Sequence, residues 1–299
     1  MKPLLDAIVQ VGLKPVVLTT VQPYSTAFSV QRAPVHSTLP NKMSYLQQDN
    51  LVGCADDVLA TACHETMDEM TVTAESATIL EQATRQQRKC LLWHEHRLGR
   101  LTASNFHAAV RTHPLKPSMS LMKSILCPSF AANPRSPAQR WGIEHEDDAR
   151  NMYAELYSDH RHHVVQSAGL VISKEHAYLG ASPDGWISDK CCGDGVLEVK
   201  CPYSIRHQSP DTAEYLYRDD DYSLVLDCKH SYYAQVQGQI HICDVHYCDF
   251  VVWTEKGIAV VRVFRDDNFW NTMLPKLTKL FQCSILPRLL TGESRSVPI

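Results

Sequence analysis

The order of helical and extended patterns predicts an α/β (α+β) fold, with a mixed central β-sheet flanked by helices. Two observations carry this prediction. Three short extended segments joined by Gly and Asp turns lie between helical segments in the middle of the chain, and a hairpin pattern lies between the last two helical segments. No internal repeat and no sustained heptad pattern occurs in the sequence.

Residues 79–157, the first part of a domain predicted over 79–299, are predicted to be mainly helical. Residues 79–99 have helix-like periodicity, and residues 102–110 (TASNFHAAV) begin with small polar residues that favour a helix start. Further helices are predicted over residues 118–127 and 136–157, the second with Pro137 in its first turn, where proline is tolerated.

The remainder of this domain, from residue 162 onward, is predicted to alternate between strands and helices. Strands are predicted within residues 162–173, 177–188 and 195–203, and a helix over residues 230–243. A hairpin with its turn at Glu255–Gly257 and a closing helix over residues 266–290 complete the predicted order.

Residues 1–78 differ from the remainder of the chain. They include a stretch rich in Pro, Ser and Thr without sustained periodicity. We therefore expect a poorly ordered or partly helical N-terminal extension over 1–78, with a helix near Asn50–Ala62, followed by one domain over 79–299.

The composition excludes several classes of protein. Hydrophobic residues make up 44% and charged residues 21%, which is typical of globular proteins and excludes wholesale disorder. No apolar run approaches the roughly 20 residues that cross a bilayer. The 11 cysteines follow no repeating frame and no secretory signal precedes them, so we expect an intracellular protein of the nucleus or cytoplasm with free thiols.

The net charge of −4 conceals an uneven distribution. Residues 1–80 contain 4 basic and 8 acidic residues, whereas residues 85–140 contain 10 basic residues and one acid, Glu95. Exposed Lys and Arg are often merely solvated, but a basic stretch beside acidic motifs is also what an enzyme acting on a polyanion needs.

The clearest chemical motif is SPDG (182–185) followed by Glu198-Val199-Lys200. On a strand, Glu198 and Lys200 project to one face, and Asp184 could meet Glu198 at the end of the sheet. Carboxylates converging near a lysine suit Mg²⁺ or Mn²⁺, but an ordinary turn aspartate beside a cross-strand ion pair would have the same pattern.

Two predicted helices carry further candidates. On the first, Glu146 shares a face with Ala149, Arg150 and Tyr153, although a solvated face with a Glu146–Arg150 pair is the alternative. On the second, Gln235 and Gln239 share a face with Ile242. Buried amides need partners, so a helix cap or a buried water is as compatible with this pattern as an active-site role.

Together the motifs resemble a known family. RLGRLTASNF (97–106), WGIEHEDDAR (141–150), GASPDG (180–185), LEVKCPY (197–203) and YYAQVQGQI (232–240) look like the phage lambda exonuclease, or YqaJ-type alkaline exonuclease, branch of the PD-(D/E)XK nuclease superfamily. The resemblance covers roughly residues 88–255. It implies a restriction-endonuclease-like fold and a magnesium-dependent 5′-to-3′ exonuclease that acts on linear duplex DNA, of the kind found in viral recombination.

The resemblance also assigns roles to residues. It implies a catalytic set of Glu146, Asp184, Glu198, Lys200 and Gln235, with Gln237 as the competing glutamine. One or two Mg²⁺ ions, with Mn²⁺ as a substitute, would be held by Asp184, Glu198, Glu146 and the backbone carbonyl of Val199. Arg97, Ser104 and Ser182 fall where the family binds a 5′-terminal phosphate, which suits the planar fork of arginine.

Partners and alternatives remain open at this point. We expect sequence-independent binding of DNA ends, no membrane, and a homo-oligomer, which the resemblance alone suggests is a trimer. The segment between Cys201 and His230 departs from the family pattern. The alternatives are a catalytically silent DNA-end-binding module, a site-specific endonuclease, and a zinc site built from His241, Cys243, His246 and Cys248 with other cysteines, although their spacing fits no closed zinc knuckle.

Overall fold

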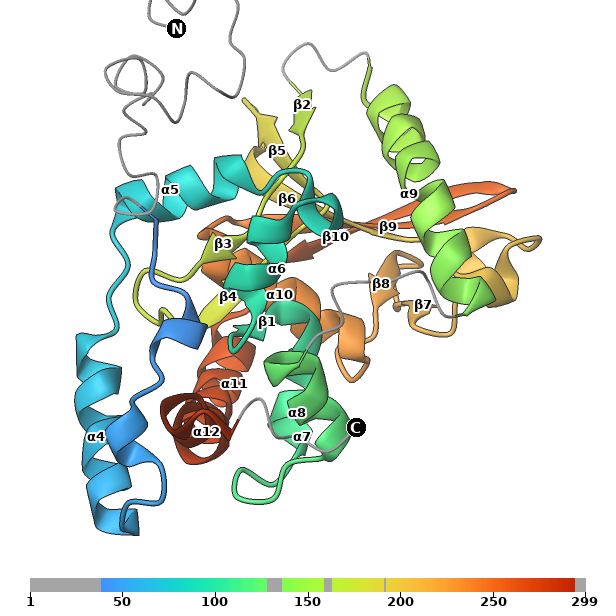
Figure 1. Cartoon of the computed structure of the whole chain (residues 1–299). Helices are drawn as coiled ribbons and strands as arrows, with labels where there is room; N and C mark the ends of the chain where they lie inside the picture. Colours follow the sequence, from blue (N-terminus) through green and yellow to red (C-terminus); the bar gives the residue numbers. More distant parts are fainter. Residues whose placement is uncertain (1–38, 128–135, 159–162, 191, 294–299) are drawn as a thin grey trace, which may run out of the picture. The chain divides into compact units, whose positions relative to one another are not determined.

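The structure, a computed structural model, describes residues 39–127, 136–158, 163–190 and 192–293 (Figure 1). Residues 40–299 form one compact unit. The helices of the first half are α4 Asp56–Glu69, α5 Ala74–Ala83, α6 Leu91–Arg97, α7 Phe106–Arg111, α8 Met119–Leu126 and α9 Pro137–Leu156. Those of the second half are α10 Ser231–Cys243, α11 Asp267–Leu280, a π-helical turn Phe281–Ile285 and α12 Leu286–Thr291.

The strands form three sheets. The largest has the order β10-β9-β6-β5-β2, in which β9 and β6 are parallel and the other neighbours are antiparallel. Its strands are β2 His163–Gln166, β5 Gly185–Asp189, β6 Gly193–Lys200, β9 Tyr247–Thr254 and β10 Gly257–Phe264. A smaller sheet has the order β1-β4-β3, with β1 Leu101–Thr102, β4 Leu179–Ala181 and β3 Val171–Ile172. β7 Leu216–Arg218 and β8 Leu224–Leu226 form a separate hairpin.

Two helices cover the opposite faces of the five-stranded sheet. Val236 and Ile240 of α10 pack with Val196 of β6, whereas Ala149 and Tyr153 of α9 pack with the next β6 residue, Leu197, on the other side. Because alternate residues of a strand point to opposite faces, Glu198 and Lys200 face α10 together with Val196. The side chains of Glu198 and Lys200 therefore lie under α10.

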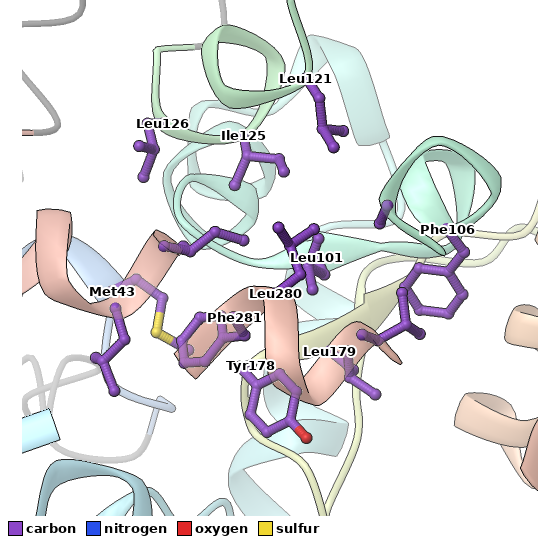
Figure 2. Close-up of a cluster of buried hydrophobic side chains, with 14 of the residues drawn as sticks. Met43, Leu101, Phe106, Leu121, Ile125, Leu126, Tyr178, Leu179, Leu280 and Phe281 are labelled. Atoms are coloured by element: carbon purple, nitrogen blue, oxygen red, sulfur yellow. The ribbon is translucent and has the colours of Figure 1, made fainter. Parts of the chain in front are cut away.

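A third apolar cluster joins the small sheet to the C-terminal helices (Figure 2). Leu101, Leu179 and Phe281 lie at its centre and are fully buried. Met43 (2% exposed) and Leu51 (3% exposed) belong to the same cluster.

The N-terminal boundary differs from the expected division at residue 78. The compact unit begins at Pro40, and α4 lies alongside α12 (Figure 1). Lys42 forms an ion pair with Glu95 (2.9 Å), and the backbone N–H of Gln48 donates to the carbonyl oxygen of Leu290 (2.9 Å). The segment from Pro40 onward is thus built into the core, while residues 1–38 of the expected extension lie outside the described residues.

Some predicted elements are divided by tertiary contacts. The helix expected over 79–99 is interrupted after α5, where Thr84 Oγ1 accepts the N–H of Leu170 (2.8 Å) and Gln87 adopts a positive φ of 45°. The closing helix contains a π-helical turn before Pro287, which has no N–H to continue the α-helical ladder. The helices at 118–127, 136–157 and 230–243 and the hairpin at 247–264 are confirmed to within a residue or two.

Within the described residues, no helix is both long and apolar enough to span a bilayer.

Candidate active site

Glu198 and Lys200 of β6 point to the same side of the sheet, as the strand pattern predicts. Glu198 is 3% exposed, and its Oε1 atom accepts a short hydrogen bond from Lys200 Nζ. The ammonium group also lies 4.7 Å from the centre of the Tyr232 ring. Burial alone would lower the pKa of Lys200, but the attraction of Glu198 and Asp184 outweighs it, so the pKa is raised. Lys200 is therefore a protonated donor at neutral pH.

The other atoms around the Glu198 carboxylate come from α10. Gln235 Nε2 donates to Oε1 (2.6 Å) and Gln239 Nε2 donates to Oε2 (2.7 Å). Gln237 points elsewhere, because its amide bonds to the backbone of Phe264 (2.8 Å) and Asp266 (2.9 Å). Both Glu198 oxygens are thus bound by amides that lie one helical turn apart.

Gln239 is the site residue to which sequence reasoning assigned no role. The i, i+4 spacing placed Gln239 on the same face as Gln235, but that spacing did not identify its partner. Gln239 is 1% exposed, and its Oε1 atom has no hydrogen-bond partner among the described residues. It therefore contributes a donor to Glu198 and leaves one buried acceptor unsatisfied.

Asp184 lies at the turn between β4 and β5 and is fixed to β6. Its N–H donates to the carbonyl oxygen of Leu197 (2.8 Å), and its Oδ2 atom accepts the N–H of Val199 (2.7 Å). Burial raises the pKa of Asp184 well above its usual value, and the charges of Glu198 and Glu146 raise it further. The lysine and the Val199 N–H oppose this increase without cancelling it.

Glu146 reaches the same region from α9 on the other face of the sheet. A capping box at Ser136 fixes the start of α9, and burial of Ala149 and Tyr153 fixes which face meets the sheet. Arg150, one turn after Glu146, donates to the carbonyl oxygen of Asp184 (3.0 Å) and lies 3.6 Å from the Glu146 carboxylate. Burial raises the pKa of Glu146 despite Arg150, and the negative charge of Glu198 contributes to the increase.

The donor set suits a hard divalent cation in its chemistry. Asp184 and Glu146 each have a raised pKa and each is affected by the charge of Glu198, and a cation between them would relieve this repulsion. In the described part of the chain, however, no group of three or more His, Cys, Asp and Glu side chains is arranged to hold a metal ion. The oxygens of Glu198 are engaged by Lys200 and by Gln235 and Gln239 of α10. Among the described residues, His241, Cys243, His246 and Cys248 likewise belong to no such group.

A second cluster surrounds Arg97 at the end of α6. Its guanidinium stacks on the Trp93 ring (4.1 Å) and its Nη1 atom lies 3.4 Å from Ser182 Oγ, which also accepts the indole N–H of Trp93 (2.9 Å). Burial lowers the pKa of Arg97 to about 10. No described carboxylate forms an ion pair with Arg97, so this half-buried cation is suited to binding an anion.

Ser104 lies near this cluster without a recorded contact to Arg97. It is exposed, and its Oγ atom lies 3.2 Å from Thr102 Oγ1. Parallel pairing of Thr102 with Gly180 places Ser104 and Ser182 just beyond the same ends of neighbouring strands. Two of the three residues expected in the phosphate pocket, Arg97 and Ser182, are therefore in direct contact, and the third lies at the same sheet edge.

Comparison with known proteins identifies a family for this arrangement. The model of the YqaJ-like viral recombinase domain matches residues 92–246, which include every site residue described above. An uncharacterized protein of Acanthamoeba polyphaga mimivirus, R354, is 29% identical over 119 residues, which cover 36% of this chain and 19% of that protein. The chain thus spans about a fifth of the length of this relative.

Solved structures resemble the chain in fold. The Shutoff and Exonuclease Protein of Kaposi's sarcoma-associated herpesvirus has a TM-score of 0.50 at 13% identity, covering 78% of this chain and 75% of its own. A SOX–DNA complex has a TM-score of 0.52 at 14% identity, covering 78% and 74%. The alkaline exonuclease LHK-Exo of Laribacter hongkongensis is 24% identical, with a TM-score of 0.47 and coverage of 68% and 94%. The predicted restriction-endonuclease-like fold class is confirmed.

Proposed function

The chain belongs to the YqaJ-like viral recombinase domain family, and on this premise we propose that it is a metal-dependent deoxyribonuclease that digests linear duplex DNA from its 5′ ends. The observation that carries the proposal is that Asp184 bonds to β6 beside Glu198 and Lys200, while Arg150 of α9 bonds to the Asp184 carbonyl oxygen and lies 3.6 Å from the Glu146 carboxylate. A binding module would gain nothing from carboxylates that repel one another in a buried place, whereas a phosphodiesterase needs them to hold a cation.

Each side chain has a distinct part in the proposed reaction. Asp184, Glu198, the carbonyl oxygen of Val199 and, in support, Glu146 would hold Mg²⁺ or Mn²⁺. When bound, the metal would neutralise the phosphate and lower the pKa of a coordinated water. Lys200, which keeps its proton, orients the attacking water and stabilises negative charge on the phosphate oxygens. Gln235 holds the Glu198 carboxylate in place through its 2.6 Å hydrogen bond.

The Arg97 cluster supports a preference for 5′-phosphorylated ends. A terminal phosphate carries more charge than an internal one, and a half-buried guanidinium without a carboxylate partner gains most from such a ligand. Ser182 adds a neutral donor beside Arg97, and Ser104 would contact the phosphate from the neighbouring strand end. Digestion from 5′ to 3′ follows if this pocket holds the end while the carboxylates act on the next linkage.

Binding of nucleic acid by this chain is part of the proposal. One solved SOX structure contains DNA and another contains RNA, so the test includes both polymers. No motif in the sequence resembles a helix that reads bases in the major groove, and we expect binding that is independent of DNA sequence. A homo-oligomer and a nuclear or cytoplasmic location stay predictions from the sequence.

Hydrolysis of linear duplex DNA in Mg²⁺ by the wild type and by Lys200→Met tests the reaction. We expect the substitution to reduce the rate by roughly 10²–10³-fold, as the loss of one preorganised donor at a developing oxyanion does. Lys190→Met, which removes an exposed lysine after β5, is the matched control and should keep full activity. DNA binding without any hydrolysis by the wild type would favour the silent end-binding module, and faster cleavage of RNA would contradict the proposed substrate.

Arg97→Ala tests the polarity separately. The ratio of rates on 5′-phosphorylated and 5′-hydroxyl ends should fall toward one, because the pocket would no longer distinguish them. An equal loss of rate on both substrates would remove Arg97 from this role.

A further inference from the structure

A short turn beside the active site, Gln87–Lys89, has a backbone that needs an explanation. It is a single 3-10 turn between α5 and α6, and Gln87 has a φ of 45°. A residue with a side chain adopts this left-handed conformation at an energetic cost, and such strain persists where the surroundings hold it in place. The contacts of the turn should therefore reveal what is being held.

Gln87 ties the turn to the loop that carries Asp184. Its Nε2 atom donates to the carbonyl oxygens of Pro183 (2.8 Å) and Ala168 (3.0 Å), and Pro183 directly precedes Asp184. On the other side, the ring of His94 on α6 donates to the carbonyl oxygen of Arg88 (2.8 Å). Three hydrogen bonds thus fix a strained turn in one position relative to the active-site carboxylates.

The fixed turn carries two exposed cations directly after the anchored Gln87. Neither the Arg88 nor the Lys89 side chain has a hydrogen bond or ion pair among the described residues. Because Gln87 is bonded to Pro183 in the loop that carries Asp184, the two cations lie next to that loop and are available to a ligand.

We propose that Arg88 and Lys89 form a cationic rim that binds backbone phosphates of the DNA strand entering the active site, and that Gln87 positions them. A site containing Glu146, Asp184 and Glu198 repels a polyanion, and two unpaired cations at its border offset this repulsion. Merely solvated side chains would not require a strained turn whose Gln87 amide bonds both to Pro183 of the Asp184 loop and to Ala168. The inference rests on the proposed function, since it names the residues that hold that substrate.

The salt dependence of DNA binding tests the rim. The assay measures fluorescence anisotropy of a labelled blunt duplex at increasing KCl, with Ca²⁺ in place of Mg²⁺. Each phosphate contact contributes about 0.9 to the slope of log K against log salt, so Arg88→Gln/Lys89→Gln should reduce the slope by about 1.8. Lys116→Gln removes an exposed cation of the same basic stretch and should leave the slope unchanged. An unchanged slope in the double variant, or an equal decrease with Lys116→Gln, would overturn the rim.

Gln87→Gly tests the positioning role, because glycine tolerates the positive φ while the hydrogen bonds to Pro183 and Ala168 are lost. Both cations remain, so the salt slope should stay at its wild-type value. The affinity should fall about 2–10-fold for each side chain that must now be ordered on binding. An affinity equal to that of the wild type would show that Gln87 does not position the rim.

Different results would contradict the cationic rim and the proposed hydrolysis. If the wild type digests DNA and the double variant keeps the wild-type slope, the rim is wrong and the proposed function stands. If the slope decreases as expected but the wild type never hydrolyses DNA, the proposed function is wrong and the rim stands. The double variant should also bind 5′-phosphate and 5′-hydroxyl ends with the same loss, unlike Arg97→Ala.

Discussion

Replacing Asp184 by asparagine should stabilise the metal-free protein while abolishing activity. The introduced amide would keep the accepted hydrogen bond from the Val199 N–H, because its side-chain oxygen can occupy the place of Oδ2. The substitution removes a charge that burial disfavours and that Glu198 and Glu146 repel. It also removes the attraction to Lys200, but the raised pKa of Asp184 shows that the unfavourable contributions are larger.

The free energy of unfolding should increase by the amount that a single stabilising substitution commonly gives, about 0.5–2 kcal/mol. For a chain of this size each kcal/mol moves Tm by about 2–4 °C, so Tm should rise by roughly 1–8 °C at pH 8.

The stability gained by Asp184→Asn should increase with pH. The folded-state pKa of Asp184 is raised above the ordinary value of 3.8, so the folded state keeps this proton to a higher pH than the unfolded state. The stability of the wild type therefore falls as pH rises through the interval between the two pKa values. The advantage of Asp184→Asn should be absent near pH 4 and complete once the raised pKa has been passed.

Thermal melting with and without Mg²⁺ measures both effects. The wild type should gain about 2.7 kcal/mol at a metal concentration 100 times Kd, whereas Asp184→Asn should respond weakly because a ligand is missing. The order of the two melting temperatures should then reverse on addition of metal. A lower Tm for Asp184→Asn in metal-free buffer at pH 8, or an equal response of both proteins to Mg²⁺, would refute the reasoning.

Three further substitutions test the framework of the site. Gln239→Met should raise the Mg²⁺ concentration for half-maximal hydrolysis by about 10-fold, because the Glu198 carboxylate loses the hydrogen bond that orients it. An unchanged dependence of the rate on Mg²⁺ would contradict this. Gly238→Ala would place a Cβ 2.5 Å from the buried Phe106 ring, and the clash of about 1–3 kcal/mol should exceed the gain of about 1 kcal/mol in helix propensity. Urea unfolding should show a net loss of stability, and an increase would mean that the ring can move. Tyr153→Phe removes the 2.6 Å hydrogen bond to the buried Asp249 and should lower the free energy of unfolding by about 1.5–3 kcal/mol in the same measurement. A change below about 0.5 kcal/mol, the scatter of neutral substitutions, would show that this hydrogen bond is dispensable.

Much of the fold could be predicted because local patterns and tertiary packing agree there. The helix predicted over 136–157, with Pro137 in its first turn, and the hairpin predicted over 247–264 are both realised in the structure. Residues 162–173 were expected to form one strand, but they form β2 and β3 of different sheets. The cause is a contact with α5, where Gly169 donates its N–H to Glu81 Oε1 (2.9 Å), and no local pattern records such a distant partner.

The site shows the same division between local and distant information. The strand period was enough to place Glu198 and Lys200 together, and the motif spacing was enough to bring Asp184 beside them. The role of Gln239 could not be predicted, because a helix period gives the face of a residue but not the group that it meets. Gln87 was equally hidden, since its positive φ and its bonds to Pro183 and Ala168 exist only in the assembled structure.

These hidden contacts explain how a single chain can carry an active site that works against its own stability. Three carboxyl groups converge where burial raises the pKa of two of them. The fold offsets this with hydrogen-bond donors and cations. Lys200 and the α10 amides bond to Glu198, a backbone N–H bonds to Asp184, and Arg150 lies near Glu146. Neutral amides and a single lysine can yield to a divalent cation, whereas a guanidinium on every carboxylate would exclude it. Replacing an amide donor to Glu198 by a guanidinium, as in Gln235→Arg, should therefore raise Tm without metal and abolish the response to Mg²⁺, and a preserved response would contradict this account.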